Sequence, residues 1–232
     1  MYPEDCVQYL VEPKWWEKDD GKNLRRGRLV RAYIPISDQV PNKLTVVGRN
    51  DPRAHDTAHF KIEPSRIGQR APKPGLPVAA TPQFENEEFG VYRVKKRPAI
   101  IVADGSEEIP AKLTRGMANR NTSPMVLLAP TFGCEGGQKR GGYNQAFVDS
   151  VRRCNFPQFF WDRIPLSGAN ESIIRFDQIQ PMGKHHDAIE ITEHYLSREA
   201  LEVLDDWLYW YCFEIVPDDG VLAMVREAVS LS

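Results

Sequence analysis

An arginine and an aspartate stand two residues apart in the apolar stretch Ser172 to Ile179, which reads Ser-Ile-Ile-Arg-Phe-Asp-Gln-Ile. A guanidinium group can bind an anion and a carboxylate can accept a proton, so this pair could do chemistry at one place. On a strand, alternate side chains point to the same face, which would set Arg175 and Asp177 roughly 6–7 Å apart. A surface ion pair on an edge strand is the plainer interpretation, and such a pair contributes little to stability.

Short apolar runs bounded by turn residues predict the strands that must position this pair. Two of them, 43–48 and 59–63, are joined by the turn-forming Asn50-Asp51-Pro52 and should form a hairpin. Residues 107–123 are polar, and we expect a loop there. The strands expected from these runs are 28–36, 43–48, 59–63, 91–94, 97–103, 125–131, 158–164 and 172–179.

Helical spacing is confined to three segments. Residues 143–154 carry apolar side chains on one side and end in two arginines, which suits the helix dipole. Ser197 is the expected N-cap of a longer helix that ends near Phe213, and a short helix should follow over 221–231. Because 207–213 is apolar on all sides, we expect it to pack on two sides or to form an oligomer contact. Several short strands closed by one helix predict a mainly β fold, a small and partly open β-barrel with C-terminal helices.

The chain organises into a single domain, 1–232, with additions. We interpret 1–24 as an irregular N-terminal extension whose tryptophans pack back onto the body. Residues 37–88 form an inserted hairpin and a proline-rich loop, which should be extended. A second insertion, 133–157, combines a basic loop with a short helix, and 197–231 holds the C-terminal helices.

The composition of the 232 residues is that of a soluble globular protein, with 41% hydrophobic and 27% charged residues and a net charge of −2. Basic residues crowd 22–31, 95–97 and 139–153, whereas the last fifty residues are mainly acidic. This asymmetry would suit a polyanionic ligand on one face, and scattered solvated charge is an equally good interpretation. The four cysteines form no CxxC pair, residues 1–5 open no secretory signal, and no apolar run nears the ~20 residues of a membrane helix. We therefore expect a cytoplasmic protein with free thiols.

Two motifs suggest a ligand, and we reject both. The glycine-rich passage 133–142 lacks the G-x-x-x-x-G-K-[ST] order of a phosphate-binding loop, so it predicts a flexible loop and no nucleotide site. His185, His186 and Asp187 follow the key strand, but no third ligand has a recognisable spacing. A surface turn is the better interpretation, and we expect neither a metal nor another cofactor.

The order of these pieces resembles the MazF/PemK (Kid) toxins of bacterial toxin–antitoxin pairs, over about half of the chain. The closest likeness is Arg175-Phe-Asp-Gln178, which is similar to the Arg-Cys-Asp-Gln of the PemK branch. The other matching stretches are Arg26-Gly27 with 29–35, the Arg-Pro strand 96–102, 126–131 with its closing proline and threonine, 159–164 with 171–178, and the helix 197–213. The resemblance implies an SH3-like, partly open barrel.

The chain also departs from the family pattern. The Gly-His-Glu-Gln element of the family's first loop is missing, and about fifty residues take its place. No catalytic histidine or glutamate of that loop is therefore carried over, and His55 or His59 could replace it only through folding. Thr131 directly follows Pro130, where the family has one residue between them, and on a strand this shift would turn Thr131 to the other face.

The activity that the resemblance implies is cleavage of single-stranded RNA without a metal, by attack of the ribose 2′-hydroxyl on the adjacent phosphate. Asp177 is the candidate base, Arg175 and Arg97 the candidate phosphate clamps, and Thr131 a possible hydroxyl donor, although it could equally satisfy its own turn. Phe132, Tyr143, Phe159 and Trp161 could stack bases, but core packing is the commoner fate of such residues. The residues expected to contact RNA are Lys95, Lys96, Gln178, Lys139, Arg140 and His185.

Three functions remain open at this point. The first is an endoribonuclease toxin, a homodimer that blocks growth or translation and is neutralised by a cognate antitoxin with an acidic tail. The second is an inactive barrel of the same kind that binds RNA or a protein partner. The third is a gyrase-poisoning toxin of similar shape, which acts through its terminal helix. Arg97, Arg175 and Asp177 together favour the first, and the missing first-loop element favours the second.

Overall fold

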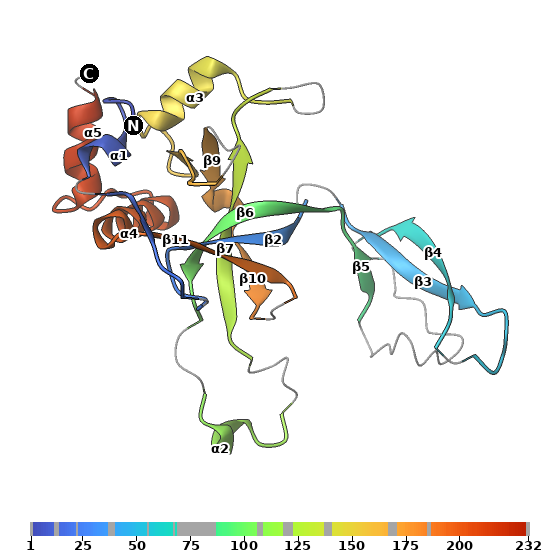
Figure 1. The fold of residues 1–232 in the computed structure, drawn as a ribbon. Helices are drawn as coiled ribbons and strands as arrows, with labels where there is room; N and C mark the ends of the chain where they lie inside the picture. The colour runs from blue at the N-terminus through green and yellow to red at the C-terminus, as the bar shows by residue number, and fades with distance from the viewer. Residues whose placement is uncertain are drawn as a thin grey trace. The chain divides into compact units, whose positions relative to one another are not determined.

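The structure, a computed structural model, describes residues 2–11, 14–21, 23–36, 40–54, 56–66, 68, 87–105, 109–117, 123–136, 141–166, 171–184 and 187–230. These form two compact units, one of Met1–Tyr33 with Lys96–Ser232 and the other of Ile34–Lys95. The described part is mainly β, as predicted (Figure 1). Its elements are α1 (Val7–Leu10), β1 (Trp16–Lys18), β2 (Arg28–Pro35), β3 (Asn42–Gly48), β4 (His59–Pro64), β5 (Phe89–Val91), β6 (Val94–Ala103), α2 (Ala111–Thr114), β7 (Met125–Gly133), α3 (Gln145–Arg152), β8 (Phe159–Asp162), β9 (Ser172–Arg175), the 3-10 helix η2 (Phe176–Gln178), β10 (Gln180–Gly183), β11 (Ile189–Leu196), α4 (Arg198–Phe213) and α5 (Val221–Ser230).

The sheet of the first unit is organised around β7. The strand order is β1-β11-β2-β6-β7-β9-β8, and β10 also pairs with β7. Along β7 the partner changes, because its first half pairs with β10 and β6 and its end pairs with β9. In the described part of the chain this path is open, from β1 at one end to β8 at the other. The strand β9 therefore lies inside the sheet, between β7 and β8, and not at an edge.

The apolar runs form the central strands, where their side chains are buried in the core. The Ile100, Ile101 and Val102 centre of β6 is buried, as are Val126 and Leu128 of β7. β-Branched side chains pack well on a pleated surface, and burying each large one contributes about 1.5–3 kcal/mol. The strands expected over 97–103 and 125–131 are therefore confirmed.

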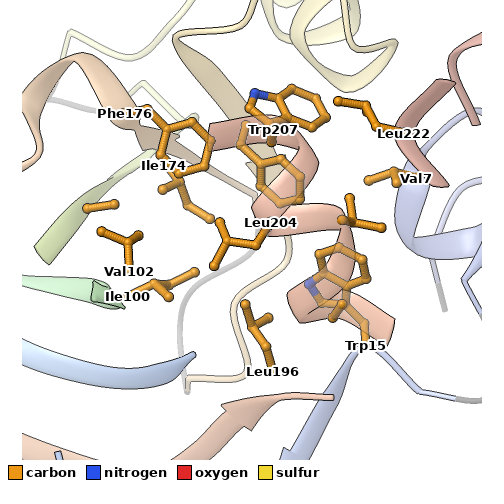
Figure 2. Close-up of a cluster of buried hydrophobic side chains, with 14 of the residues drawn as sticks. Val7, Trp15, Ile100, Val102, Ile174, Phe176, Leu196, Leu204, Trp207 and Leu222 are labelled. Atoms are coloured by element: carbon orange, nitrogen blue, oxygen red, sulfur yellow. The ribbon is translucent and has the colours of Figure 1, made fainter. Parts of the chain in front are cut away.

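The helix α4 covers the sheet with one apolar stripe. The Oγ of Ser197 accepts a hydrogen bond from the backbone N–H of Ala200 at 3.1 Å, which confirms the predicted N-cap. Figure 2 shows Leu204 and Trp207 of this helix packed toward the buried residues of the sheet. Of the two predictions for 207–213, packing on two sides is only partly right, because Trp207 and Trp210 are buried while Tyr209 and Phe213 are exposed, and the oligomer contact stays a prediction.

The N-terminal extension packs back through its aromatic residues, as predicted. Trp15 is buried and stacks on Phe160 with ring centroids 5.7 Å apart. The carboxylate of Asp162 accepts hydrogen bonds from the Tyr2 hydroxyl at 2.9 Å and from the indole N–H groups of Trp15 and Trp16 at 3.2 and 3.0 Å. The segment is not wholly irregular, since it contains α1 and the strand β1, which pairs with β11.

The second unit contains a three-stranded sheet in the order β4-β3-β5. Strands β3 and β4 are antiparallel neighbours, with Val46 opposite Phe60, so the hairpin predicted from the Asn50-Asp51-Pro52 turn is confirmed. Strand β5 pairs with the other side of β3. Most of the predicted proline-rich loop, from 69 to 86, lies outside the described residues.

Some predictions about elements are wrong. The strand expected over 172–179 ends at Arg175, and Phe176–Gln178 form a 3-10 turn instead. Ile174 and Phe176 are both buried. The polar region 107–123 contains the short helix α2, and the strands β10 and β11 have no counterpart among the predicted elements.

Candidate functional site

Two arginines from different strands meet at one aromatic ring. Arg97 lies on β6 and Arg175 on β9, and the strand between them, β7, carries Phe132. The guanidinium carbon of Arg97 is 4.0 Å from the centroid of the Phe132 ring, and that of Arg175 is 5.7 Å from it. Contact with an aromatic face holds a guanidinium in place, because the cation is attracted to the ring. The sheet thus gathers two positive groups that are 78 positions apart in the sequence.

Asp177 forms an ion pair with one of these arginines, Arg175. The Nε of Arg175 donates to Oδ1 of Asp177 at 2.6 Å, and its Nη2 donates to Oδ2. The two residues flank Phe176 at the start of the 3-10 turn, and not on one continuous strand as predicted. The geometry is a bidentate ion pair in which the two side chains keep 21% and 30% of their surface exposed. Solvent and ligands can therefore reach it.

The guanidinium of Arg175 is held from several sides. It lies 4.9 Å from the ring centroid of Phe159, and the hydroxyl of Tyr143 hydrogen-bonds to it. The Tyr143 ring in turn stacks on Phe147 at 5.5 Å. The hydrogen bonds and charge of Asp177, with a smaller contribution from Tyr143, keep the pKa of Arg175 above its ordinary value although partial burial opposes this. Arg175 is thus charged and fixed in position.

A tyrosine of α4 completes the surroundings of Asp177. Burial raises the pKa of Tyr211, and the negative charge of nearby Asp177 raises it further. The Tyr211 ring also lies 6.5 Å from that of Phe176, the residue that precedes Asp177. In the sequence, Tyr211 falls within the apolar segment 207–213 of the predicted helix. No sequence signal marks it as a neighbour of Asp177, because the contact depends on how α4 packs on the sheet.

Thr131 does not lie where its predicted role as a hydroxyl donor to a phosphate requires. It is buried on β7, and its hydroxyl donates to the backbone carbonyl of Pro98 at 3.1 Å. This bond ties β7 to β6 next to Arg97. The proton of the hydroxyl is therefore used within the sheet, and we do not include Thr131 among the groups that face a ligand.

The remaining predicted contact residues are dispersed. Lys96 forms an ion pair with Glu190, which also binds Arg31, and Gln178 ends the 3-10 turn beside Asp177. Lys95 belongs to the second unit. Trp161 is buried and belongs to the core, whereas Phe132, Tyr143 and Phe159 are only partly buried. The positions that lie outside the described residues are His55, Lys139, Arg140, His185 and His186.

Other features of the described residues bear on ligand classes. Over the described ranges, no group of three or more His, Cys, Asp or Glu side chains is arranged to hold a metal ion. Of the helices that the structure describes, none is both long and apolar enough to cross a membrane. The four cysteines, Cys6, Cys134, Cys154 and Cys212, are free thiols, as expected, and only Cys212 is exposed.

Chemically, the site offers two fixed cations, one carboxylate and two tyrosines on partly exposed aromatic surface. Such a set can bind an anionic group that carries flat rings, because guanidinium groups bind phosphate bidentately and aromatic faces stack on bases. No protein-family model matches the chain, and no curated protein matches it.

Proposed function

We propose that this protein is a metal-independent endoribonuclease that cleaves single-stranded RNA. The observation that carries the proposal is the convergence of Arg97 and Arg175 on Phe132, with Asp177 two residues beyond Arg175. The short motifs that resemble the MazF/PemK toxins support it, and we propose with it that the mainly β fold is the SH3-like, partly open barrel of that family. Arg97 and Arg175 thus lie on the two strands that flank β7, and Asp177 lies in the 3-10 turn after β9.

In the proposed reaction, the ribose 2′-oxygen attacks the adjacent phosphorus while the bond from phosphorus to the 5′-oxygen breaks. Asp177 takes the proton of the 2′-hydroxyl, and the leaving 5′-oxygen takes up a proton from water. The products are a 2′,3′-cyclic phosphate and a free 5′-hydroxyl. No electrons are transferred to another reactant, and no covalent bond to the enzyme forms.

The arginines act on the charge of the phosphate. As the 2′-oxygen adds, negative charge grows on the phosphate oxygens, and fixed guanidinium groups stabilise that charge without reorganising. An arginine is a poor acid because its pKa exceeds ~12, so we assign Arg97 and Arg175 to charge stabilisation and not to proton transfer. Removal of one such donor typically lowers the rate by about 10²–10³-fold.

The test is an incubation of the purified protein with a long single-stranded RNA in EDTA. We expect discrete cuts from the parent, and loss of those cuts from Asp177→Asn and Arg97→Ala. Glu202→Gln and Arg198→Ala are matched controls, because these residues form an exposed ion pair on α4 and their substitution makes the same changes of charge. Cuts that disappear in EDTA, or that persist in both site variants, would overturn the proposal.

One observation favours a second candidate, a binding module without catalysis. Both oxygens of Asp177 accept hydrogen bonds from Arg175, so in this arrangement the carboxylate faces the guanidinium and serves its ion pair. A module of this kind would bind RNA through the same arginines and leave it intact. Binding without cuts, in a preparation free of any co-purified partner, would establish this function in place of the first.

The resemblance extends the proposal to the biological setting. We infer a cytoplasmic toxin that inhibits growth or translation, forms a homodimer, and is neutralised by an antitoxin with an acidic tail. A small acidic-tailed protein encoded next to this chain, able to suppress its toxicity when the two are expressed together, would support this setting. Growth that is unaffected by the parent protein alone would contradict it.

A further inference from the structure

The bidentate pair between Arg175 and Asp177 occupies the same donors that a phosphate would use. A guanidinium presents its N–H groups as a planar fork, and this fork binds either two carboxylate oxygens or two phosphate oxygens. Here Nε and Nη2 of Arg175 both donate to Asp177. A phosphodiester that binds this edge of Arg175 must therefore displace the carboxylate.

The surroundings make Asp177 the movable partner and Arg175 the fixed one. Arg175 lies against Phe159 and Phe132 and donates a hydrogen bond to the Tyr143 hydroxyl, so its guanidinium keeps its place without the carboxylate. Asp177 projects from the 3-10 turn toward solvent, while its neighbour Phe176 is buried and anchors the turn through a 3.0 Å hydrogen bond from its N–H to the Gln158 carbonyl. Rotation of the Asp177 side chain alone thus opens the fork.

We propose that Asp177 is an internal anion that fills the Arg175 fork until an RNA phosphate displaces it. The displaced carboxylate then lies beside the bound phosphate, where it can accept the proton of a 2′-hydroxyl. Substrate binding thereby converts Asp177 from a blocking group into a base, which resolves the conflict between its ion pair and its catalytic role. The part of this inference that concerns the base rests on the proposed endoribonuclease function.

The test compares binding of a single-stranded 2′-O-methyl RNA, which has no free 2′-hydroxyl and cannot be cut by this reaction. A fluorescent 20-mer of mixed sequence is titrated with each protein, and anisotropy gives Kd at one fixed salt concentration. Asp177→Asn should bind about 3–10-fold more tightly than the parent, since an exposed competing ion pair of modest strength is lost. Glu202→Gln removes one exposed negative charge from another Arg pair and should change Kd less than about 2-fold.

A double-mutant cycle separates competition for the fork from a general effect of charge. In an Arg175→Ala background, Asp177→Asn should give no gain in affinity for the RNA, because the guanidinium fork is absent. An equal gain in both backgrounds would overturn the inference, as would unchanged or weaker binding by Asp177→Asn. Thermal unfolding checks that each protein is folded, and Asp177→Ser serves as a second variant that also removes the carboxylate.

The two proposals can fail separately. If the parent cuts RNA but Asp177→Asn and Asp177→Ser give no gain in binding, the blocking role of Asp177 is wrong and the endoribonuclease stands. If the parent leaves RNA intact but Asp177→Asn binds more tightly only when Arg175 is present, the endoribonuclease fails and the internal anion stands.

Discussion

Replacement of the buried Asp162 by asparagine is expected to change how the stability of the protein depends on pH. Asp162 ends β8 without any exposed surface, and its oxygens accept hydrogen bonds from Tyr2, Trp15 and Trp16. Burial raises its pKa from the ordinary 3.8 to about 7, although these hydrogen bonds favour the ionised form. Asparagine has the shape of the protonated carboxyl and does not titrate, so it removes this dependence.

The direction of the pH dependence follows from the pKa of Asp162 in the unfolded chain, 3.8, and in the native state, about 7. Between about 4 and 7, the native state retains a proton that the unfolded chain has released, so the free energy of unfolding falls as pH rises. A shift of this size changes the free energy of unfolding by about 2–3 kcal/mol between pH 5 and 8. Burial lowers the pKa of His194, which has the opposite effect, but His194 is present in both proteins and cancels in their difference.

The assay is urea unfolding of the parent and Asp162→Asn, followed by tryptophan fluorescence from pH 5 to 8. The free energy of unfolding of the variant, relative to the parent, should increase by about 2–3 kcal/mol over this range. Asp205→Asn removes an exposed carboxylate and is the control, with a difference that stays nearly constant. A difference for Asp162→Asn that is flat, or that decreases with pH, would refute the reasoning.

Three further substitutions test other parts of the structure. Tyr2→Phe removes a donor to Asp162 and should lower the free energy of unfolding by about 1–3 kcal/mol at pH 7, measured by urea unfolding. The control, Tyr9→Phe at an exposed position, should lower it by less than about 0.5 kcal/mol, and an equally small effect of Tyr2→Phe would contradict the role of its hydrogen bond. Thr131→Val loses the hydrogen bond to the Pro98 carbonyl and should lower the free energy of unfolding by about 1 kcal/mol while RNA cleavage is retained. Loss of cleavage would show that Thr131 belongs to the site. Phe132→Leu removes the ring that both arginines contact and should lower the cleavage rate on the order of 10–100-fold with unchanged circular dichroism, and full activity would show that the ring does not position them.

The elements that sequence patterns predicted well include those that carry a continuous run or a stripe of apolar residues. The Ile-Ile-Val centre of β6 and the stripe of α4 from Ser197 onward belong to this class, because burial and capping act over a few neighbouring residues. The missed strand β11 alternates charged and apolar residues, and Glu190 and Glu193 pair with cations from other segments. The stability of such a strand depends on partners distant in the sequence.

In the candidate site, too, some features follow from neighbouring residues in the sequence and others depend on distant ones. The sequence singled out Arg97, Arg175 and Asp177 as a possible group, and the structure places Arg97 on β6, Arg175 on β9 at the other side of β7, and Asp177 in the 3-10 turn that follows β9. Alternation along a strand could not predict the 3-10 turn that joins Arg175 to Asp177, because the turn depends on how Phe176 is buried beneath it. Nor could it predict the neighbouring Tyr211, whose place depends on the packing of α4.

The measurement that tests the central claim most directly is the chemical nature of the RNA ends. A defined single-stranded RNA is incubated with the parent protein in EDTA, and the products are analysed by mass spectrometry. Attack by the 2′-hydroxyl at a site of Arg97, Arg175 and Asp177 predicts a 2′,3′-cyclic phosphate on one product and a 5′-hydroxyl on the other. Products with a 5′-phosphate and a 3′-hydroxyl, or the same products at the same rate from Asp177→Asn, would contradict it.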